Sequence, residues 1–181
     1  MSDLKAIAAS CGFDTVAVLD PATLQFLPEV RDMCVADRCQ HYGKSWSCPP
    51  ANGSLEYWKE RAEKYSAGLL LQVIGEREDS YDIEAMMEVS KLTDQVGQRL
   101  TEELQKTGAD FLFLSAGACT RCKVCTYPDA PCRFPETLFP SMEACGLFVS
   151  QVCRDNGVPY YYGEEKIAFT CCLLYIPESA K

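Results

Sequence analysis

Four cysteines in one short segment have the spacing expected of ligands to an iron–sulfur cluster. In the segment CTRCKVCTYPDAPCRFP, three thiols stand at every third position and a fourth follows seven residues later. A loop with thiols at i, i+3 and i+6 can wrap three sulfurs around one inorganic core, and a more distant cysteine completes the set, as in bacterial ferredoxins. The spacing therefore predicts a [4Fe–4S] site on Cys119, Cys122, Cys125 and Cys132.

The residues around these four cysteines also suit a negatively charged cluster. Arg121, Lys123 and Arg133 lie next to the predicted ligands. Their charge favours deprotonated thiols and offsets the charge of the cluster. Structural zinc is the main alternative, although zinc sites usually consist of two separated CxxC pairs. Redox-active thiols or disulfides are a third interpretation.

A second group of three cysteines lies in the segment CVADRCQHYGKSWSCPP. Cys34, Cys39 and Cys48 are irregularly spaced there, among turn-forming residues. Three thiols can hold a cube whose fourth iron stays open to water or substrate, or they can take a fourth protein ligand from elsewhere in the chain. A third interpretation is that they are separate core residues, because free cysteine is often buried. The candidates for a fourth ligand are Cys11, Cys171 and Cys172.

The single histidine, His41, restricts the kinds of site that this chain can build. With one imidazole, any metal site must be mainly thiolate, and thiolate sites select iron–sulfur clusters or zinc. His41 itself is either a further ligand of the second group or a hydrogen-bonding residue of a polar loop. The sequence contains no GxGxxG pattern and no Walker loop, so no nucleotide site is predicted.

The other cysteines and several aromatic residues have structural as well as functional interpretations. Cys145 and Cys153 share one face of a predicted helix and are expected in the core. Cys171 and Cys172 are adjacent on a predicted strand, so they must point to opposite faces of a sheet. Aromatic residues either pack in the core or line a pocket that shields a cluster. These residues are Tyr42, Trp46 and residues 160–162.

The elements that must position these loops alternate between helical and strand patterns. Helices are predicted over residues 4–10, 55–65, 83–106 and 141–156. Strands are predicted over residues 15–19, 69–74, 110–115, 160–162 and 167–176. The last two strands are expected to form a C-terminal β-hairpin. Residues 33–53 have little periodicity and are expected to form an ordered loop.

Two of these helices have specific sequence signals. Ser54 is a suitable N-cap for the helix at residues 55–65, whose buried side should include Tyr57 or Trp58. The helix at residues 83–106 has an apolar stripe that continues through Val96, Leu100 and Leu104. The N-terminal part of that predicted stripe consists of Met86, Met87 and Leu92.

Strands separated by helices predict an α/β or α+β fold. We expect one iron–sulfur-binding domain over residues 1–181, with a mixed sheet flanked by helices and two cysteine-rich metal loops. The chain has 181 residues, of which 48% are hydrophobic and 24% charged, which is enough apolar surface for one packed core. Disulfides are therefore not needed to compensate for a small core.

Charge and hydropathy exclude several classes of partner. A net charge of −9 argues against binding to nucleic acid or anionic lipid, and it suits a redox partner with a basic docking face. No apolar run approaches the ~20 residues of a membrane span. The N-terminal sequence has no secretory signal pattern, so we expect a cytoplasmic protein with reduced thiols.

Several sequence blocks together resemble a known family. The pattern C-x4-C-x2-YGK-x-W-x-CPP from Cys34 to Pro50, with CTRCKVC, PCRFP and PSMEACG, resembles the cysteine-rich predicted metal-binding proteins of domain of unknown function 2284, over nearly the whole chain. The resemblance implies metal binding by both cysteine groups. The segment from Cys119 to Cys132 also resembles a ferredoxin motif, although its gap before Cys132 is longer and Cys-Arg-Phe-Pro replaces Cys-Pro.

These observations lead to three hypotheses for the function. The first is a protein with one or two [4Fe–4S] clusters that passes electrons to a partner protein. The second is an enzyme, such as a dehydratase, desulfidase or reductase, in which an open-iron cluster on Cys34, Cys39 and Cys48 binds a small-molecule substrate. The third is a structural zinc protein without a redox role.

Overall fold

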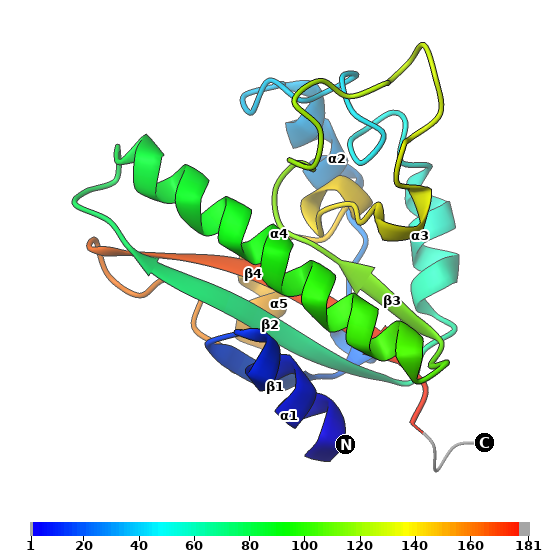
Figure 1. The fold of residues 1–181 in the computed structure, drawn as a ribbon, viewed down its shortest axis with the longest axis vertical. Helices are drawn as coiled ribbons and strands as arrows, with labels where there is room; N and C mark the ends of the chain where they lie inside the picture. The colour runs from blue at the N-terminus through cyan, green and yellow to red at the C-terminus, as the bar shows by residue number, and fades with distance from the viewer. Residues whose placement is uncertain (1, 178–181) are drawn as a thin grey trace.

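A four-stranded antiparallel sheet is the frame of the molecule in the computed structural model, which describes residues 2–177 (Figure 1). The strand order is β1-β2-β4-β3. The central strands β2 and β4 pair along ten residues, from Ala67 opposite Tyr175 to Glu76 opposite Lys166. The strands span Thr15–Leu19 (β1), Ala67–Glu76 (β2), Phe111–Leu114 (β3) and Lys166–Tyr175 (β4).

Two separate hydrophobic clusters cover the two faces of this sheet. On one face, α1 (Ser2–Cys11) and the long helix α4 (Ile83–Lys106) pack their apolar sides, including Leu100 and Leu104. On the other face lie α3 (Leu55–Ala62), the short 3-10 helix η3 (Glu143–Cys145) and α5 (Val149–Asp155). Because both faces are covered, the middle of β2 and most of β4 are buried runs of apolar residues.

Local sequence signals account for most of the helices. The Ser54 hydroxyl accepts a hydrogen bond from the Tyr57 N–H at 3.1 Å and caps α3, as predicted. Trp58 is the buried aromatic residue of that helix, whereas Tyr57 is exposed. The predicted bounds of α4 are confirmed, and the Asp82 carboxylate caps its N-terminus by accepting from the Ala85 N–H at 3.0 Å. α1 ends at Cys11. The next residue, Gly12, has φ +110°, a backbone conformation that residues with a side chain rarely adopt.

The mixed α/β fold is confirmed, but the sheet is antiparallel throughout rather than mixed. The β2–α4–β3 unit has the helical crossover of a parallel pair, and β2 and β3 do run in the same direction. They are not neighbours, however, because β4 is inserted between them and pairs antiparallel with both.

The expected C-terminal hairpin is also wrong. Residues 160–162 form no strand. Strand β4 pairs with β2 along its whole length and with β3 only over residues 172–175, and residues 160–162 do not pair with the remaining edge of β4. The Tyr162 hydroxyl instead lies 2.7 Å from Gln72 Oε1 on β2, and this hydrogen bond holds the segment against the sheet.

The helix predicted over residues 141–156 is divided into two pieces. Gly146 has φ +95° and ends η3, and its carbonyl accepts from the Leu27 N–H at 2.8 Å before α5 begins. Cys145 and Cys153 therefore lie on different elements instead of one helix face. Both are nevertheless fully buried in one cluster, as core packing predicted.

Two further predictions on helices need correction. A helix, α2 (Pro28–Val35), ends within the segment that was expected to be irregular from residue 33. On α4, Met86, Met87 and Leu92 are exposed, because the buried stripe at that end begins with Val89 and Thr93 instead. No helix within residues 2–177 is both long and apolar enough to span a membrane.

Candidate functional site

Two cysteine loops lie side by side beyond one end of the sheet (Figure 1). We call residues 34–53 the first cysteine loop and residues 116–140 the second cysteine loop. The Trp46 indole N–H of the first loop donates to the Ala130 carbonyl of the second at 3.1 Å, and its ring meets Tyr127 edge-on with centroids 5.0 Å apart. The Cys119 N–H donates to Ser47 Oγ at 3.2 Å. The two loops therefore form one packed unit.

Helix α4 anchors the second loop. The Asp94 carboxylate accepts hydrogen bonds from the N–H and the hydroxyl of Thr120. Arg121 donates to Gln98 Oε1 at 2.5 Å and to the Thr137 hydroxyl, and its guanidinium lies 4.8 Å from the Phe134 ring centroid. These contacts fix the N-terminal end of the cysteine segment to α4, and Arg121 links that end to residues 134 and 137 at the other.

All four predicted ligands of the second loop line one small cavity. The cavity has a volume of about 30 Å³, and the first loop contributes Ser45 and Trp46 to its wall. Within residues 2–177, however, no three His, Cys, Asp or Glu side chains are grouped closely enough to ligate a single metal ion. The four thiols therefore line the same cavity, but their sulfurs are not close enough together to coordinate one metal ion. The four cysteines that line this small cavity are Cys119, Cys122, Cys125 and Cys132.

Hydrogen-bond donors around the small cavity favour a thiolate at Cys125. Burial raises the pKa of this thiol, but hydrogen bonds from the backbone N–H groups of Tyr127, Trp46 and Thr126 and from the Ser45 hydroxyl outweigh burial and lower the pKa. The Phe134 N–H also donates to Cys132 Sγ at 3.4 Å. At Cys119 the balance is reversed, since burial raises the pKa.

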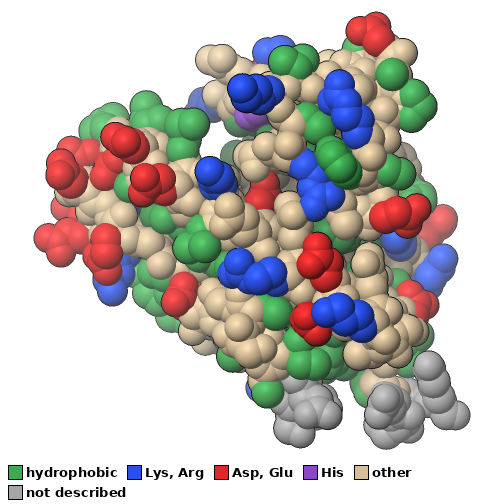
Figure 2. Space-filling view, in the orientation of Figure 1, with side chains coloured by type: hydrophobic (Ala, Val, Ile, Leu, Met, Phe, Trp, Pro, Cys, Tyr) green, Lys and Arg blue, Asp and Glu red, His purple; other side chains and the backbone are tan. Residues whose placement is uncertain are grey.

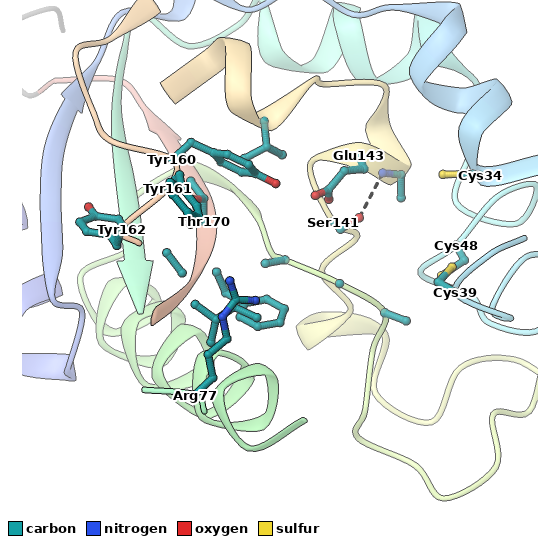
Figure 3. Close-up of a pocket in the computed structure, with 18 of the residues that line it drawn as sticks. Cys34, Cys39, Cys48, Arg77, Ser141, Glu143, Tyr160, Tyr161, Tyr162 and Thr170 are labelled. Carbon is teal, nitrogen blue, oxygen red and sulfur yellow. Dashed lines mark hydrogen bonds between the residues drawn. The ribbon is translucent and has the colours of Figure 1, made fainter. Parts of the chain in front are cut away.

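The three predicted ligands of the first loop face a different and much larger cavity of about 500 Å³ (Figure 3). Cys48 is buried, Cys34 is half-buried and Cys39 is exposed. Burial raises the pKa of Cys34, and the proximity of Cys39 adds to this increase. Burial likewise raises the pKa of Cys48. The structure therefore brings the three thiols to one end of this large cavity, in an environment that favours the neutral form of Cys34 and Cys48.

A buried carboxyl group stands between the thiols and the opposite wall of the large cavity. The residue Glu143 is half-buried as a whole, but its Oε2 atom has less than 1 Å² of accessible surface and no hydrogen-bond partner among the described residues. Burial raises the pKa of Glu143. In Figure 3 its carboxyl group points into the cavity, toward the hydroxyl of Tyr160.

Sequence analysis missed three of the polar residues of this cavity. Arg77 follows the end of β2, Ser141 precedes η3, and Glu143 is the first residue of η3. The only sequence signal was the PSMEACG block, which contains the last two. For Tyr42 and residues 160–162 the sequence left core packing and pocket lining open, and all four residues line this cavity. Trp46 lines the small cavity instead.

The proposed fourth ligands of the first loop lie elsewhere in the described structure. Cys171 and Cys172 are fully buried in the clusters on opposite faces of the sheet, which confirms their predicted orientation. Cys11 packs at the end of α1, where its carbonyl accepts from Arg99 at 2.8 Å. His41 is exposed and lines neither cavity. All twelve cysteines are free thiols.

Two buried serines connect the two cysteine sets. Ser45 Oγ and Ser47 Oγ are 2.9 Å apart, and both residues are buried. Ser45 lines the small cavity together with Cys125 and lowers the pKa of that thiol, whereas Ser47 Oγ lies 3.7 Å from Cys48 Sγ and accepts from the Cys119 N–H. We call this pair the serine bridge. It is a continuous hydrogen-bonded path from the small cavity to the large one.

Comparison with known proteins supports a metal site. The family model described as predicted metal-binding protein, DUF2284, matches residues 17–175. This range includes both cysteine loops, the serine bridge and every residue of the two cavities named above. No curated protein and no solved structure matches the chain.

Proposed function

We propose that this chain, which belongs to the family of predicted metal-binding proteins DUF2284, is an iron–sulfur protein that transfers electrons through a cluster at the small cavity. One observation carries the proposal: four cysteines with ferredoxin-like spacing line a single cavity. The ligands would be Cys119, Cys122, Cys125 and Cys132. A bound [4Fe–4S] cluster supplies one-electron transfer, and four protein thiolates leave its irons no open position.

The chemistry of the donors fits such a cluster. Backbone N–H groups of Tyr127, Trp46 and Thr126 and the Ser45 hydroxyl lower the pKa of Cys125, so they favour negative charge on its sulfur. Lys123 and Arg133 are exposed beside the ligands and add positive charge. A structural zinc ion on the same four thiolates is the alternative, and acid-labile sulfide distinguishes the two.

An electron-transfer partner would approach over the second loop. Exposed Val124 and Phe134 lie on this loop together with Lys123 and Arg133. In Figure 2, Lys and Arg side chains are visible over the cysteine loops, whereas acidic side chains gather at the end where α4 begins. A partner with an acidic docking face therefore suits this loop better than the basic partner that the net charge suggested. The proposal places the protein in a reducing compartment such as the cytoplasm.

A second candidate function rests on the large cavity. Three thiols at one end of a cavity of about 500 Å³ are the arrangement expected of an open-iron cluster that binds a small molecule. A cube held by Cys34, Cys39 and Cys48 supplies an iron that acts as a Lewis acid. Glu143 and Tyr160 would orient the substrate, and the serine bridge would link this site to the small cavity. A dehydratase, desulfidase or reductase activity fits this arrangement.

Metal analysis of matched variants tests both candidates. Protein purified and reconstituted without oxygen should contain iron and acid-labile sulfide, and reduction should give a paramagnetic resonance signal. The paired replacement Cys122→Ser and Cys125→Ser should remove about four irons per chain, the content of one cube. Cys39→Ser with Cys48→Ser tests the second set in the same way.

The control is Cys11→Ala, which removes a thiol that lines neither cavity. It should retain the full iron content. Zinc without sulfide in the reconstituted protein would replace the proposal by a structural zinc site. Iron loss in the first pair but not in the second would leave electron transfer and eliminate the open-iron enzyme.

A further inference from the structure

The large cavity has a binding chemistry of its own beyond the three thiols. Its volume of about 500 Å³ lies in the range of cavities that enclose small organic ligands. The thiols occupy one end, and the opposite end is formed by Arg77 just after β2, by β4 and by the tyrosine run before β4 (Figure 3). A ligand in this cavity therefore meets different chemistry at its two ends.

The interior of the cavity presents an unused hydrogen-bond donor. Glu143 Oε2 is shielded from solvent and unpartnered among the described residues, and burial favours the protonated carboxyl. A protonated carboxyl donates one hydrogen bond. Leaving such a group unpaired is unfavourable, so the position calls for a ligand atom that accepts a hydrogen bond. A carbonyl oxygen meets this requirement.

The opposite end presents a cation. Arg77 is half-buried, and its Nε donates to the Glu164 carbonyl at 2.8 Å, which holds the side chain in place. Figure 3 shows its guanidinium among the residues that line the cavity. The neighbouring cation, Lys166, already lies 3.5 Å from Glu76. Arg77 is therefore the group available to an anion, and a guanidinium matches a carboxylate by two parallel hydrogen bonds.

The lining of the cavity also includes aromatic and small residues. Tyr160, Tyr161 and Phe169 contribute rings, and Ala116 and Gly117 contribute little side-chain volume. Rings together with small residues leave space that suits a planar apolar body. Tyr160 and Tyr161 are 51% and 64% exposed, so an unliganded cavity leaves aromatic surface in contact with water that a ligand would cover.

We infer that the large cavity binds a small aromatic carboxylate, with its carboxylate on Arg77, its ring against the tyrosines, and a carbonyl oxygen on Glu143 facing the cysteines. This inference deepens the second candidate function, because it names the substrate class of the open-iron site. Binding itself uses only protein side chains. Loss of the cluster and loss of the ligand site are therefore distinguishable.

Three related probes test the inference on unmodified protein. The first, 4-acetylbenzoate, has both a carboxylate and a ketone carbonyl. Its methyl ester lacks the anion, and 4-ethylbenzoate lacks the ketone carbonyl. Calorimetric titration of the anaerobically purified protein, with and without iron, should show binding of 4-acetylbenzoate in both forms. The methyl ester should bind about tenfold more weakly, because it cannot pair with the guanidinium. The ethyl compound should bind several-fold more weakly.

Variants assign each difference to its residue. Arg77→Met should weaken binding of 4-acetylbenzoate to the level of the ester and leave the ester unchanged. Glu143→Leu should abolish the preference for acetyl over ethyl, whereas Glu143→Gln retains a donor and should keep it. Lys123→Met, which removes a cation outside the cavity, is the control.

Equal affinity of acid and ester, or no binding of any probe at about 1 mM, would overturn the inference even if iron analysis supports both clusters. Binding without iron, in protein that assembles no cluster at the first loop, would sustain the ligand site and eliminate the open-iron enzyme.

Discussion

The small and large cavities use the same ligand type in opposite surroundings. In the small cavity, four thiols from a single segment of fourteen residues meet donors from the neighbouring loop, and the pKa of Cys125 is lowered. In the large cavity, three thiols share the space with a buried acid, an arginine and several rings, and burial raises the pKa of Cys34 and Cys48. The first arrangement stabilises charge on sulfur, and the second leaves room for a ligand.

This difference shows how one chain can divide two tasks between similar residues. A closed set of sulfurs with hydrogen-bond donors suits outer-sphere electron transfer. A thiol set at the end of a cavity, opposite polar side chains from distant segments, suits binding of a substrate. The serine bridge between the two sets is the structural element that would allow one to serve the other.

The largest effect is expected from a substitution that disrupts the large cavity and leaves the small one intact. Gly146 has φ +95°, and a side chain there would overlap Leu55 and lie 3.3 Å from the Leu27 carbonyl oxygen. Gly146→Ala should lower the free energy of unfolding by about 3 kcal/mol in urea titrations. It should also displace the segment that carries Glu143, and so reduce ligand binding in the large cavity.

Gly157→Ala is the matched control, because its φ is +68° but no atom lies within 4 Å of the added carbon. It should cost about 1 kcal/mol. Equal destabilisation by the two variants would show that the packing around Gly146 contributes nothing. Loss of iron from the second-loop cysteines in Gly146→Ala would show that the two cavities are not independent.

A smaller effect should appear in the small cavity alone. Ser45→Ala removes a hydroxyl from the wall of the small cavity that lowers the pKa of Cys125. Hydrogen bonds to cluster sulfurs stabilise the more negative, reduced state. One bond of about 1 kcal/mol corresponds to a fall of about 40 mV in the one-electron reduction potential.

A redox titration followed by paramagnetic resonance measures this potential. Ser10→Ala, which removes an exposed hydroxyl bonded to the Ile7 carbonyl, is the control and should leave the potential unchanged. If the reduction potential is unchanged in Ser45→Ala too, the serine bridge does not contact the cluster.

The smallest expected effect is on the pH dependence of the folded protein's stability, which reports the protonation of Glu143 in the large cavity. Burial raises the pKa of Glu143 in the folded protein. As pH rises above the ordinary glutamate pKa of about 4.3, the unfolded chain loses this proton first and the folded protein loses stability until the folded pKa is passed. Glu143→Gln lacks this proton, so its stability relative to the original protein should increase with pH from about 4.3 upward.

Urea titrations at several pH values test this sign, since the two proteins should differ least in acid. Glu136→Gln, which removes one exposed carboxylate from the second loop, is the control for a change of charge alone. Parallel stability curves for Glu143→Gln and the original protein would mean that the Glu143 carboxyl is ionised in the fold.

The two cavities also differ in how far sequence could anticipate them. The four thiols of the small cavity lie within one short loop, and thiol spacing restricts such a loop strongly enough to predict their convergence. Arg77, Glu143 and Tyr160 lie far apart in sequence, and each has an ordinary interpretation on its own. Their convergence depends on the order of the strands and on the break at Gly146, which local pattern did not reveal.

The sequence by itself indicated the candidate thiol ligands, the capped helices α3 and α4, and the alternation of helices and strands, because these depend on short-range spacing, hydrophobic periodicity and local hydrogen bonds. Only the tertiary structure decided that β4 lies between β2 and β3, that Tyr160 faces a cavity instead of a sheet edge, and that the two cysteine loops share a serine bridge. Each of these depends on which distant segments pack together, and that choice is made by burial of the whole core.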